Sequence, residues 1–484
     1  MRLGLSRSFW WMLAVIVLVT VAAVLLPRLY KVALLGSGYM AQTLCSGVFV
    51  SGRSMDALLT EDLAGPGLGS LRYFQPVLDR QGEKVSAAVY GIAGQTSIYR
   101  DGLGCTLVDG RSEQALREEA DGLFPPQAPD SDAEWPQGER VSLAPLPEGV
   151  DGAALASAID AIFSEPDPAR PRNTRALVVV HGGRIVAERY ASGFDDAMPL
   201  IGWSMTKTLV NALVGLRVKD GTLALEDDAL LPEWRSADDP RRAITLNELM
   251  RMTSGLQFDE DYSNNLSDVA QMLYVHGNAA RFAASKPVVH PPGTDWHYSS
   301  GTTNILAAIL RETFADEHGY LRFPRERLFA PLGMKSAVLE PDAAGTFMGS
   351  SFFYASARDW ARLGLLFLRD GVWQGTRLLP EGWVAYSLTP TPQSPDGQYG
   401  AQVWLKLEGS SGLGEPPMPE DGFYMLGYDA QIVAMVPSRD LVIVRLGLTP
   451  EDGDWDNARD LAPLLNAFPA LDKDRATPPA AVRP

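Results

Sequence analysis

The chain has 484 residues, of which 46% are apolar and 21% charged, so it can form a substantial core in one large domain or in two. Its formal net charge of −17 and the lack of a long Lys/Arg run exclude a basic surface for nucleic acid. The simplest interpretation of this charge is an acidic, solubilising surface.

The first distinctive element is an apolar segment over residues 9–26, which carries no charge and in which only Thr20 is polar. Its length fits a transmembrane helix. Two arginines precede it, as in a secretory signal, but residues 27–31 offer no good small-x-small cleavage site. We therefore predict an uncleaved membrane anchor over residues 1–29. The basic residues on its two sides nearly balance, so the positive-inside rule decides the orientation only weakly.

The only two cysteines, Cys45 and Cys105, follow the anchor and precede the region that carries the candidate catalytic residues. Two buried free thiols are one interpretation. A single pair beyond a membrane helix is also typical of a disulfide in an oxidising compartment, and this is the interpretation we favour. It places the rest of the chain outside the cytoplasm, in the periplasm if the protein is bacterial.

Composition divides the remaining chain. Residues 30–112 mix short β-branched runs with glycine turns and predict a small irregular module. Residues 113–148 are rich in Pro, Asp and Glu, cannot bury enough apolar surface to fold alone, and are predicted to be a linker. A catalytic domain over residues 149–470 and a tail over 471–484 complete the expected organisation.

Hydrophobic periodicity predicts the order of elements in the main domain. A helix and a β-hairpin open it, a mainly helical region follows, and a helix, a second hairpin and a last helix close it. The ranges are 153–163 for the first helix, 176–180 and 184–190 for the hairpin, 205–345 for the helical region, and 357–369, 431–436, 441–446 and 457–468 for the rest. Strands at both ends with helices between them predict an α/β (α+β) fold, with one antiparallel sheet and an inserted helical lobe.

The sharpest chemical signal is Ser204 followed three residues later by Lys207 at the start of an apolar helix. This spacing puts a hydroxyl and an amine on one helix face, near the positive end of the helix dipole. A serine nucleophile needs a base, and a lysine can serve when burial lowers its pKa. The alternative is an N-capping serine with a surface lysine, and the motif alone favours neither interpretation.

A second signal is Tyr298, which stands among small polar residues in the turn-rich segment 291–304. A phenol beside a lysine can hold or pass a proton. In isolation, a packing tyrosine with a satisfied hydroxyl would be the better interpretation.

Together, the Ser204-x-x-Lys207 motif, Tyr298-Ser299-Ser300 and the segment 252–256 resemble the serine β-lactamase and penicillin-binding superfamily. Within it, the chain is most similar to class C β-lactamase-like esterases and the 6-aminohexanoate-dimer hydrolase group, over about residues 150–470. The resemblance implies a β-lactamase-like fold. It also implies that Ser204 is the nucleophile, Lys207 the base and Tyr298 the proton shuttle to the leaving group.

Two features depart from that pattern. Ser300 stands where class C enzymes usually carry Asn, and no Lys-Thr-Gly, Lys-Ser-Gly or His-x-Gly element occurs. The expected position of that element holds the segment 424–431. By resemblance, Gly427 lets the backbone approach the substrate, and the N–H groups of Tyr428 and Ser204 form the oxyanion hole.

The missing element also bears on the substrate. Met425 and Leu426 are expected to present an apolar wall in place of the cation that binds a penicillin carboxylate. Lys406 is the candidate for a replacement cation.

The acidic loop 258–262 could line the pocket and favour an amine-bearing substrate, with Tyr262 as a candidate binding residue. A solvated run of charges is the interpretation that we favour for this loop. Five histidines show no metal-ligand spacing, so neither a metal nor another cofactor is expected; they are His181, His276, His290, His297 and His318.

We therefore expect a serine hydrolase that cleaves a small-molecule amide or ester through an acyl-enzyme on Ser204. The alternative is a catalytically silent envelope scaffold or binding protein that keeps the fold. Retention of Ser204, Lys207 and Tyr298 together favours the hydrolase, because a scaffold needs none of the three.

Overall fold

A five-stranded antiparallel sheet forms the centre of the main body in this computed structural model, which describes residues 7–65, 67–124, 132–142, 145–407 and 418–471. The strand order is β12-β13-β14-β5-β6. The bounds are Phe423–Gly427 for β12, Gln431–Val436 for β13, Leu441–Gly447 for β14, Thr174–His181 for β5 and Arg184–Tyr190 for β6. Strands from both ends of the domain thus pair in one sheet, which confirms the predicted topology.

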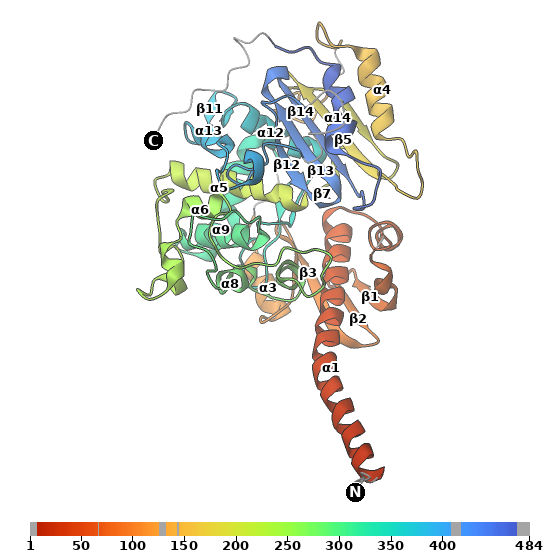
Figure 1. The fold of residues 1–484 in the computed structure, drawn as a ribbon. Coiled ribbons are helices and arrows are strands. Elements are labelled where there is room, and N and C mark those ends of the chain that lie inside the picture. The colour runs from red at the N-terminus through yellow and green to blue at the C-terminus, as the bar shows by residue number, and fades with distance from the viewer. Residues whose placement is uncertain (1–6, 66, 125–131, 143–144, 408–417, 472–484) are drawn as a thin grey trace.

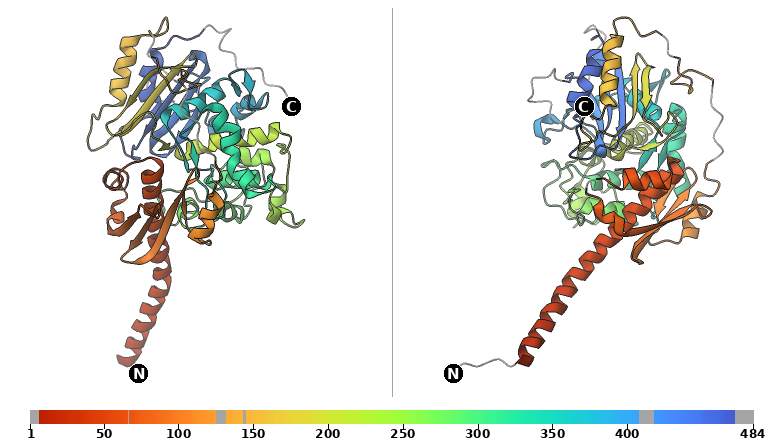
Figure 2. Two further views of the ribbon diagram at one scale, coloured as in Figure 1. Left: turned by 180° about the vertical axis from the view of Figure 1, so that it is seen from behind. Right: turned by 90° about the vertical axis from the view of Figure 1, so that its right-hand side faces the viewer.

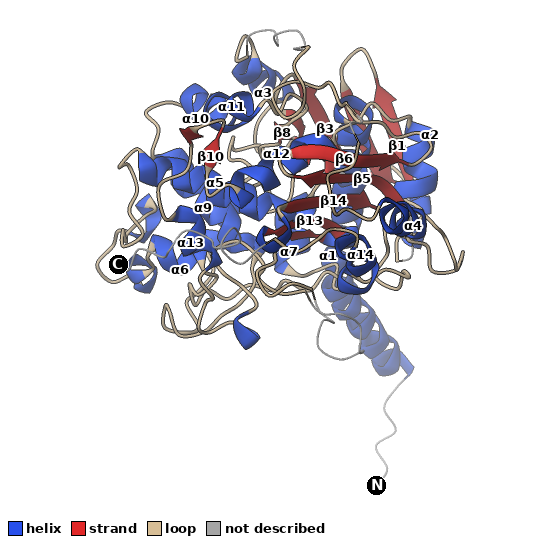
Figure 3. Ribbon diagram, turned by 90° about the horizontal axis from the view of Figure 1, so that it is seen from above, coloured by secondary structure: helices blue, strands red, loops and turns tan. Residues whose placement is uncertain are grey.

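Helices cover both faces of this sheet (Figure 3). On one face, α4 (Gly152–Ile162) and α14 (Asn457–Asn466) pack on residues such as Leu177 and Ile443. On the other face, α12 (Ala357–Leu368) packs on residues such as Val178 and Val444, in the larger core that continues into the helical lobe. Alternate residues of each strand therefore face two separate cores.

The helical lobe lies between β6 and β12 in sequence and carries most of the candidate site. Its helices are α5 (Thr206–Lys219), α6 (Leu246–Met250), α7 (Asp268–Tyr274), α8 (Ala279–Ala284), α9 (Ser300–Glu312), α10 (Glu317–Pro324), α11 (Ala330–Leu332) and α13 (Trp383–Leu388). Short strands β7 (Leu200–Ile201), β9 (Phe353–Ala355) and β8 (Val338–Leu339) form a small sheet, and β10 (Val372–Trp373) pairs with β11 (Thr376–Arg377).

The N-terminal region is more regular than its sequence predicted. Helix α1 (Arg7–Cys45) projects from the body and packs at its C-terminal end on a four-stranded antiparallel sheet (Figures 1 and 2). The strands are β1 (Phe74–Asp79), β2 (Lys84–Val89), β3 (Ile92–Arg100) and β4 (Gly104–Leu107), and a one-turn helix, α2 (Met55–Ala57), precedes them. The expectation of an irregular module was wrong, because these strands bury one face against α1.

Cys45 at the end of α1 and Cys105 in β4 form a disulfide, with 6.0 Å between their Cα atoms. The predicted pairing is thus confirmed. Helix α1 is long and apolar enough to cross a membrane, and residues 8–31 of it are almost wholly exposed. A membrane anchor and a signal sequence both fit this helix.

The segment predicted as a linker contains ordered structure. Ser112 caps α3 (Glu113–Ala120) by accepting a hydrogen bond from the backbone of Ala115. Farther along, the Trp135 side chain is buried, and Arg362 of α12 donates hydrogen bonds to backbone carbonyls next to it. Part of this acidic, proline-rich stretch is therefore held against the main body, while the domain boundaries themselves stay a prediction.

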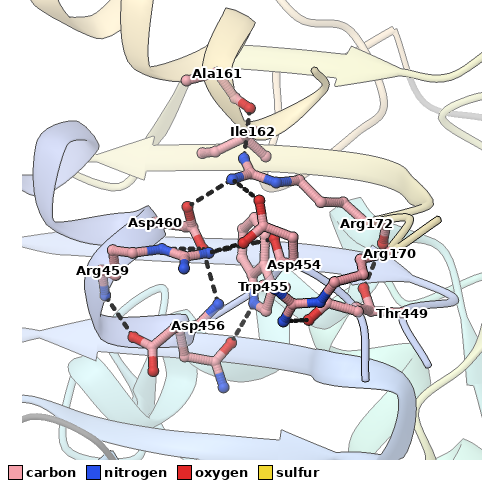
Figure 4. A network of polar contacts seen from close by, with 12 residues as sticks. Ala161, Ile162, Arg170, Arg172, Thr449, Asp454, Trp455, Asp456, Arg459 and Asp460 are labelled. Atoms are coloured by element: carbon pink, nitrogen blue, oxygen red, sulfur yellow. Dashed lines mark hydrogen bonds and ion pairs between the residues drawn. The ribbon is translucent and has the colours of Figure 1, made fainter. Parts of the chain in front are cut away.

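A polar network joins the start of β5 to the loop before α14 (Figure 4). Arg172 donates to the carbonyl of Ala161 at 2.8 Å and pairs with Asp454 and Asp460, each at 3.3 Å. Arg459 pairs with the same two carboxylates. The network fixes the ends of α4 and α14 on the outer face of the sheet.

Candidate active site

Ser204 and Lys207 lie on consecutive turns at the start of α5. Ser204 belongs to a 3-10 turn, Trp203–Met205, which runs directly into α5 and leaves its side chain partly exposed. The Lys207 side chain is buried at 2% exposure, and its Nζ lies 2.9 Å from Ser204 Oγ. The alternative of a surface lysine behind an N-capping serine is therefore wrong.

Burial changes the proton affinity of Lys207. Desolvation lowers its pKa from 10.5 to about 8, while the negative charge of Glu260 acts in the opposite direction. Its Nζ also lies 3.0 Å from Ser300 Oγ and 3.2 Å from the carbonyl of Ser350. Lys207 is thus held by three oxygens, one of which is the hydroxyl of Ser204.

Tyr298 joins the same cluster. Lys207 Nζ lies 4.9 Å from the centre of its ring. Burial raises the pKa of the phenol, and a hydrogen bond with Ser204 acts against that rise. Trp404 packs on Tyr298 with ring centres 5.3 Å apart. The phenol therefore stays protonated at neutral pH and is available as a donor beside Ser204.

Glu260 is a site residue that sequence analysis placed in a solvated acidic loop. Its carboxylate accepts hydrogen bonds from the backbone N–H of Ser300 at 2.8 Å and from Ser300 Oγ at 2.5 Å. It also accepts one from the hydroxyl of Tyr262 at 2.9 Å. The expectation of a solvated charge run was therefore wrong for Glu260. Its carboxylate contacts the hydroxyl of Ser300, which in turn contacts Lys207.

Two exposed tyrosines flank the cluster. Tyr262 and Tyr428 are 46% and 48% exposed and stack with ring centres 5.6 Å apart. Trp203, the neighbour of Ser204, meets Tyr428 edge to face at 6.1 Å. The two predicted binding residues therefore lie together on the open side of the site.

Gly427 brings the end of β12 against the turn that carries Ser204. A Cβ at position 427 would lie 2.1 Å from the carbonyl oxygen of Gly202, so no other residue fits without backbone movement. Trp203 has a φ of +49°, a strained value for a non-glycine residue. Gly427 thus lets two backbone segments, and with them Ser204 and Tyr428, approach each other.

The predicted apolar wall does not form. Met425 is completely buried in the core on the α12 side of the sheet, whereas Leu426 packs on the opposite core. Adjacent residues of a strand point to opposite faces, so the two side chains cannot line one surface. Lys406 is exposed and donates a hydrogen bond to the carbonyl of Asp396.

Two supporting residues had no signal in the sequence. The carbonyl of Ser350 accepts a hydrogen bond from Lys207 and belongs to a loop that lies 146 positions after Ser204 in the sequence. Asn304, one turn after Ser300 in α9, accepts a hydrogen bond from the N–H of Ser350 at 3.0 Å and so fixes that loop. Among the described residues, no group of three or more His, Cys, Asp or Glu side chains could hold a metal ion.

The chain is similar to known proteins in sequence and in fold. The family model described as "Beta-lactamase" matches residues 159–464, which include Ser204, Lys207, Tyr298 and Gly427. The chain is 24% identical over 305 residues to the 6-aminohexanoate-dimer hydrolase of Paenarthrobacter ureafaciens, which covers 57% of this chain and 73% of that protein.

Two further relatives agree in family or fold. Esterase EstB of Burkholderia gladioli is 28% identical over 195 residues, which are 36% of this chain and 49% of that protein. The structure of EstCE1, a hydrolase with promiscuous acyltransferase activity, superposes with a TM-score of 0.50 at 16% identity. It covers 65% of this chain and 98% of its own, and supports the fold alone.

Proposed function

The chain belongs to the beta-lactamase family, and from that membership and the geometry around Ser204 we propose that it is a serine hydrolase that forms an acyl-enzyme. Hydrolases among its relatives support the general activity. The observation that carries the mechanism is the 2.9 Å contact between Lys207 Nζ and Ser204 Oγ, made by a buried lysine whose pKa is about 8.

In the first step, neutral Lys207 accepts the hydroxyl proton of Ser204 as Oγ attacks the substrate carbonyl carbon. With a pKa of about 8, roughly a tenth of Lys207 is neutral at pH 7, against a negligible fraction of an exposed lysine. Ser300 Oγ and the Ser350 carbonyl stay in place to receive the ammonium that forms. Lys207 therefore acts first as the base and then, as the ammonium, keeps the proton until the next step.

In the second step, Tyr298 donates its proton to the leaving alcohol or amine, and its phenolate regains a proton from Lys207. The hydrogen bond of Tyr298 to Ser204 supports this relay, and Lys207 Nζ lies 4.9 Å from the centre of the Tyr298 ring. The backbone N–H groups of Ser204 and Tyr428 are proposed as the oxyanion hole, which Gly427 brings together. Water then hydrolyses the acyl-enzyme by the same relay in reverse.

A small amide or ester is the proposed substrate, and the stacked pair Tyr262 and Tyr428 is the proposed surface for its acyl chain. Exposed aromatic faces suit an apolar or linear chain. The competing proposal, a silent scaffold, predicts no covalent chemistry at Ser204.

Labelling with a fluorophosphonate probe tests the proposal directly. The purified full chain should be labelled, and peptide mapping should find the phosphonyl group on Ser204. Ser204→Ala should abolish labelling, whereas Ser164→Ala, an exposed serine at the end of α4, should label like the native protein. Labelling that persists in Ser204→Ala, or no labelling of the native chain, would contradict the proposal.

We further propose that α1 anchors the protein in a membrane, with the catalytic domain outside the cytoplasm. The exposed apolar run of α1 and the disulfide support this location. The protein should remain with membranes after a carbonate wash, and its mature N-terminus should lie before residue 9. A soluble form that begins after residue 26 would show that α1 is a removed signal sequence.

A further inference from the structure

The four-stranded sheet beside α1 carries unusually exposed apolar side chains at one end. Tyr90 and Ile92 flank the turn between β2 and β3 and are 72% and 61% exposed. Tyr73, directly before β1, is 44% exposed and lies at the same end, because Phe74 pairs with Val89. Large apolar groups gathered at one edge of a folded body mark an interaction surface.

That edge of the sheet lies on the same side as the exposed N-terminal half of α1. Gln95 of β3 donates to the carbonyl of Leu34 at 3.1 Å, and Ser97 donates to Gln42 at 2.8 Å. β3 therefore runs in the same direction as α1, and its first residue, Ile92, lies toward the exposed half of the helix. In Figures 1 and 2 this sheet lies beside the part of α1 that leaves the body.

The edge also lies close to the end of the apolar run. Helix α1 is exposed through Lys31 and becomes partly buried from Val32 onward. Val32 lies six positions, or about 9 Å along a helix, beyond Leu26, the last residue of the apolar run. The headgroup layer adds roughly 5 to 7 Å beyond the hydrocarbon on each side of a bilayer. Gln95 contacts Leu34, which lies about 12 Å beyond Leu26 along the helix, and Ile92 lies three residues, or about 10 Å, back along β3 toward the apolar run. Ile92 therefore lies at the height of the headgroups when α1 spans the membrane.

The segments that form this edge and the adjoining part of α1 carry positive charge, opposite to the charge of the whole protein. The chain has 59 acidic residues and a net charge of −17, yet the segments 27–55, 64–78 and 85–100 contain no Asp or Glu. Arg28, Lys31 and Arg72 lie in these segments, and Arg72 donates to the hydroxyl of Tyr73 at 2.7 Å. A basic and aromatic rim fits the surface of a membrane that contains anionic lipids.

We propose that the edge formed by Tyr73, Tyr90 and Ile92, which we call the hairpin edge, is a second membrane contact that rests on the headgroups of anionic phospholipids. It rests on the proposed anchoring by α1 and does not depend on catalysis. Two contacts hold the catalytic domain at one height and tilt above the bilayer, whereas a single helix would let it swing.

Fluorescence quenching tests the hairpin edge in the full chain. Ile92→Cys is labelled with an environment-sensitive dye, since the native cysteines are joined, and is reconstituted in vesicles of phosphatidylcholine and phosphatidylglycerol that carry nitroxide headgroups. Leu29→Cys, on the exposed side of α1, serves as the reference for headgroup depth. Asp160→Cys, on α4 at the far end of the molecule, serves as the distant control (Figure 1).

The dye at position 92 should be quenched about as strongly as the dye at 29 and several-fold more than the dye at 160. Its quenching should be weaker in vesicles of phosphatidylcholine alone. Arg72→Gln should also weaken the quenching in vesicles that contain phosphatidylglycerol. Quenching at 29 with none at 92 would overturn the proposal while leaving the anchor intact. No quenching at either position would overturn the anchor. Quenching at 92 that also needs a second, unlabelled copy of the chain would indicate a protein contact instead.

Discussion

Lys207 and Glu260 contact the same hydroxyl group, that of Ser300. Lys207 Nζ lies 3.0 Å from Ser300 Oγ, which donates to Glu260 Oε1 at 2.5 Å. The carboxylate is therefore close enough to influence the proton on Lys207, and it raises the pKa that burial lowers. The balance between these two effects sets the pH at which Lys207 becomes a base.

Glu260→Gln should shift the pH dependence of ester hydrolysis toward acid. In the proposed mechanism Lys207 must be neutral, so kcat/KM of the native protein should rise with pH through about 8. Removing the carboxylate charge lowers the Lys207 pKa further, so the rising limb should move to lower pH. Asp261→Asn, in the same loop, should leave the limb in place. An unchanged limb, or one displaced toward alkali in Glu260→Gln, would contradict this assignment.

The three proposed catalytic groups should differ in their effects. Ser204→Ala should abolish turnover of an ester, because no acyl-enzyme can form. Lys207→Ala and Tyr298→Phe should each lower kcat by about 100-fold or more, the range of general acid-base groups. All three variants should still bind substrate, measured by calorimetry with a slowly hydrolysed amide. Full turnover in Ser204→Ala would rule out this serine as the nucleophile.

The Cys45–Cys105 disulfide should be present in protein isolated under oxidising conditions. Alkylation without reduction should modify neither cysteine, and non-reducing peptide analysis should find the two joined. Cys105→Ser should lower the free energy of unfolding by about 2 to 4 kcal/mol, the usual range for a native disulfide. Two freely alkylated thiols would contradict the pairing and reopen the question of which side of the membrane the domain occupies.

Glu340 should make the protein less stable as the pH rises. Its buried carboxyl accepts hydrogen bonds from Ser46, Gln42 and the N–H of Cys105, and burial raises its pKa from 4.5 to about 8. Between these values the folded protein keeps a proton that the unfolded chain has released, so the contribution to stability falls with increasing pH. Glu340→Gln should lose less stability between pH 5 and 8, measured by urea unfolding.

An exposed residue provides the control for that measurement. Glu326, whose side chain is 59% exposed, lies outside this buried contact. Glu326→Gln should therefore follow the native curve. Parallel curves for Glu340→Gln and the native protein would show that Glu340 is already ionised in the folded state.

The elements predicted from sequence were those with strong periodicity. Strands β5, β13 and β14 are nearly continuous apolar runs because their two faces pack on two different cores, whereas helices α4, α12 and α14 repeat their apolar residues because each packs on one core. The N-terminal sheet was missed because its strands bury only one face against α1, so their apolar signal is weak. The many glycine turns in this region therefore led to the prediction of an irregular module.

The site could be predicted only where the interacting residues belong to one short sequence motif. Ser204 and Lys207 are three residues apart on a helix, so their contact follows from helix geometry. Glu260 and Ser350 reach the cluster through loop conformation, and no local pattern links either of them to Lys207. The expected wall of Met425 and Leu426 failed for a simple reason: neighbouring residues of a strand face opposite sides.

The last prediction concerns substrate class and rests on the missing Lys-Thr-Gly element. In the family, that element binds the carboxylate of β-lactams, and the loss of a charge-assisted hydrogen bond costs about 1.5 to 3 kcal/mol. The equivalent strand here ends in Met425, Leu426 and Gly427, none of which carries a charge. The proposed acyl-binding surface, the stacked Tyr262 and Tyr428, suits a neutral chain. We therefore expect hydrolysis of p-nitrophenyl butyrate and weak or no hydrolysis of nitrocefin.

A Lys406 variant tests whether this lysine replaces the missing carboxylate-binding cation. It is exposed, and its ammonium donates to the carbonyl of Asp396, two positions beyond a strand bridge between Trp404 and Tyr424. Trp404 packs on Tyr298, so Lys406 belongs to a segment that contacts the site. Lys406→Ala should leave butyrate ester turnover unchanged. If nitrocefin is instead turned over as fast as the best ester, and Lys406→Ala removes that activity alone, the carboxylate site has been rebuilt around Lys406 rather than lost.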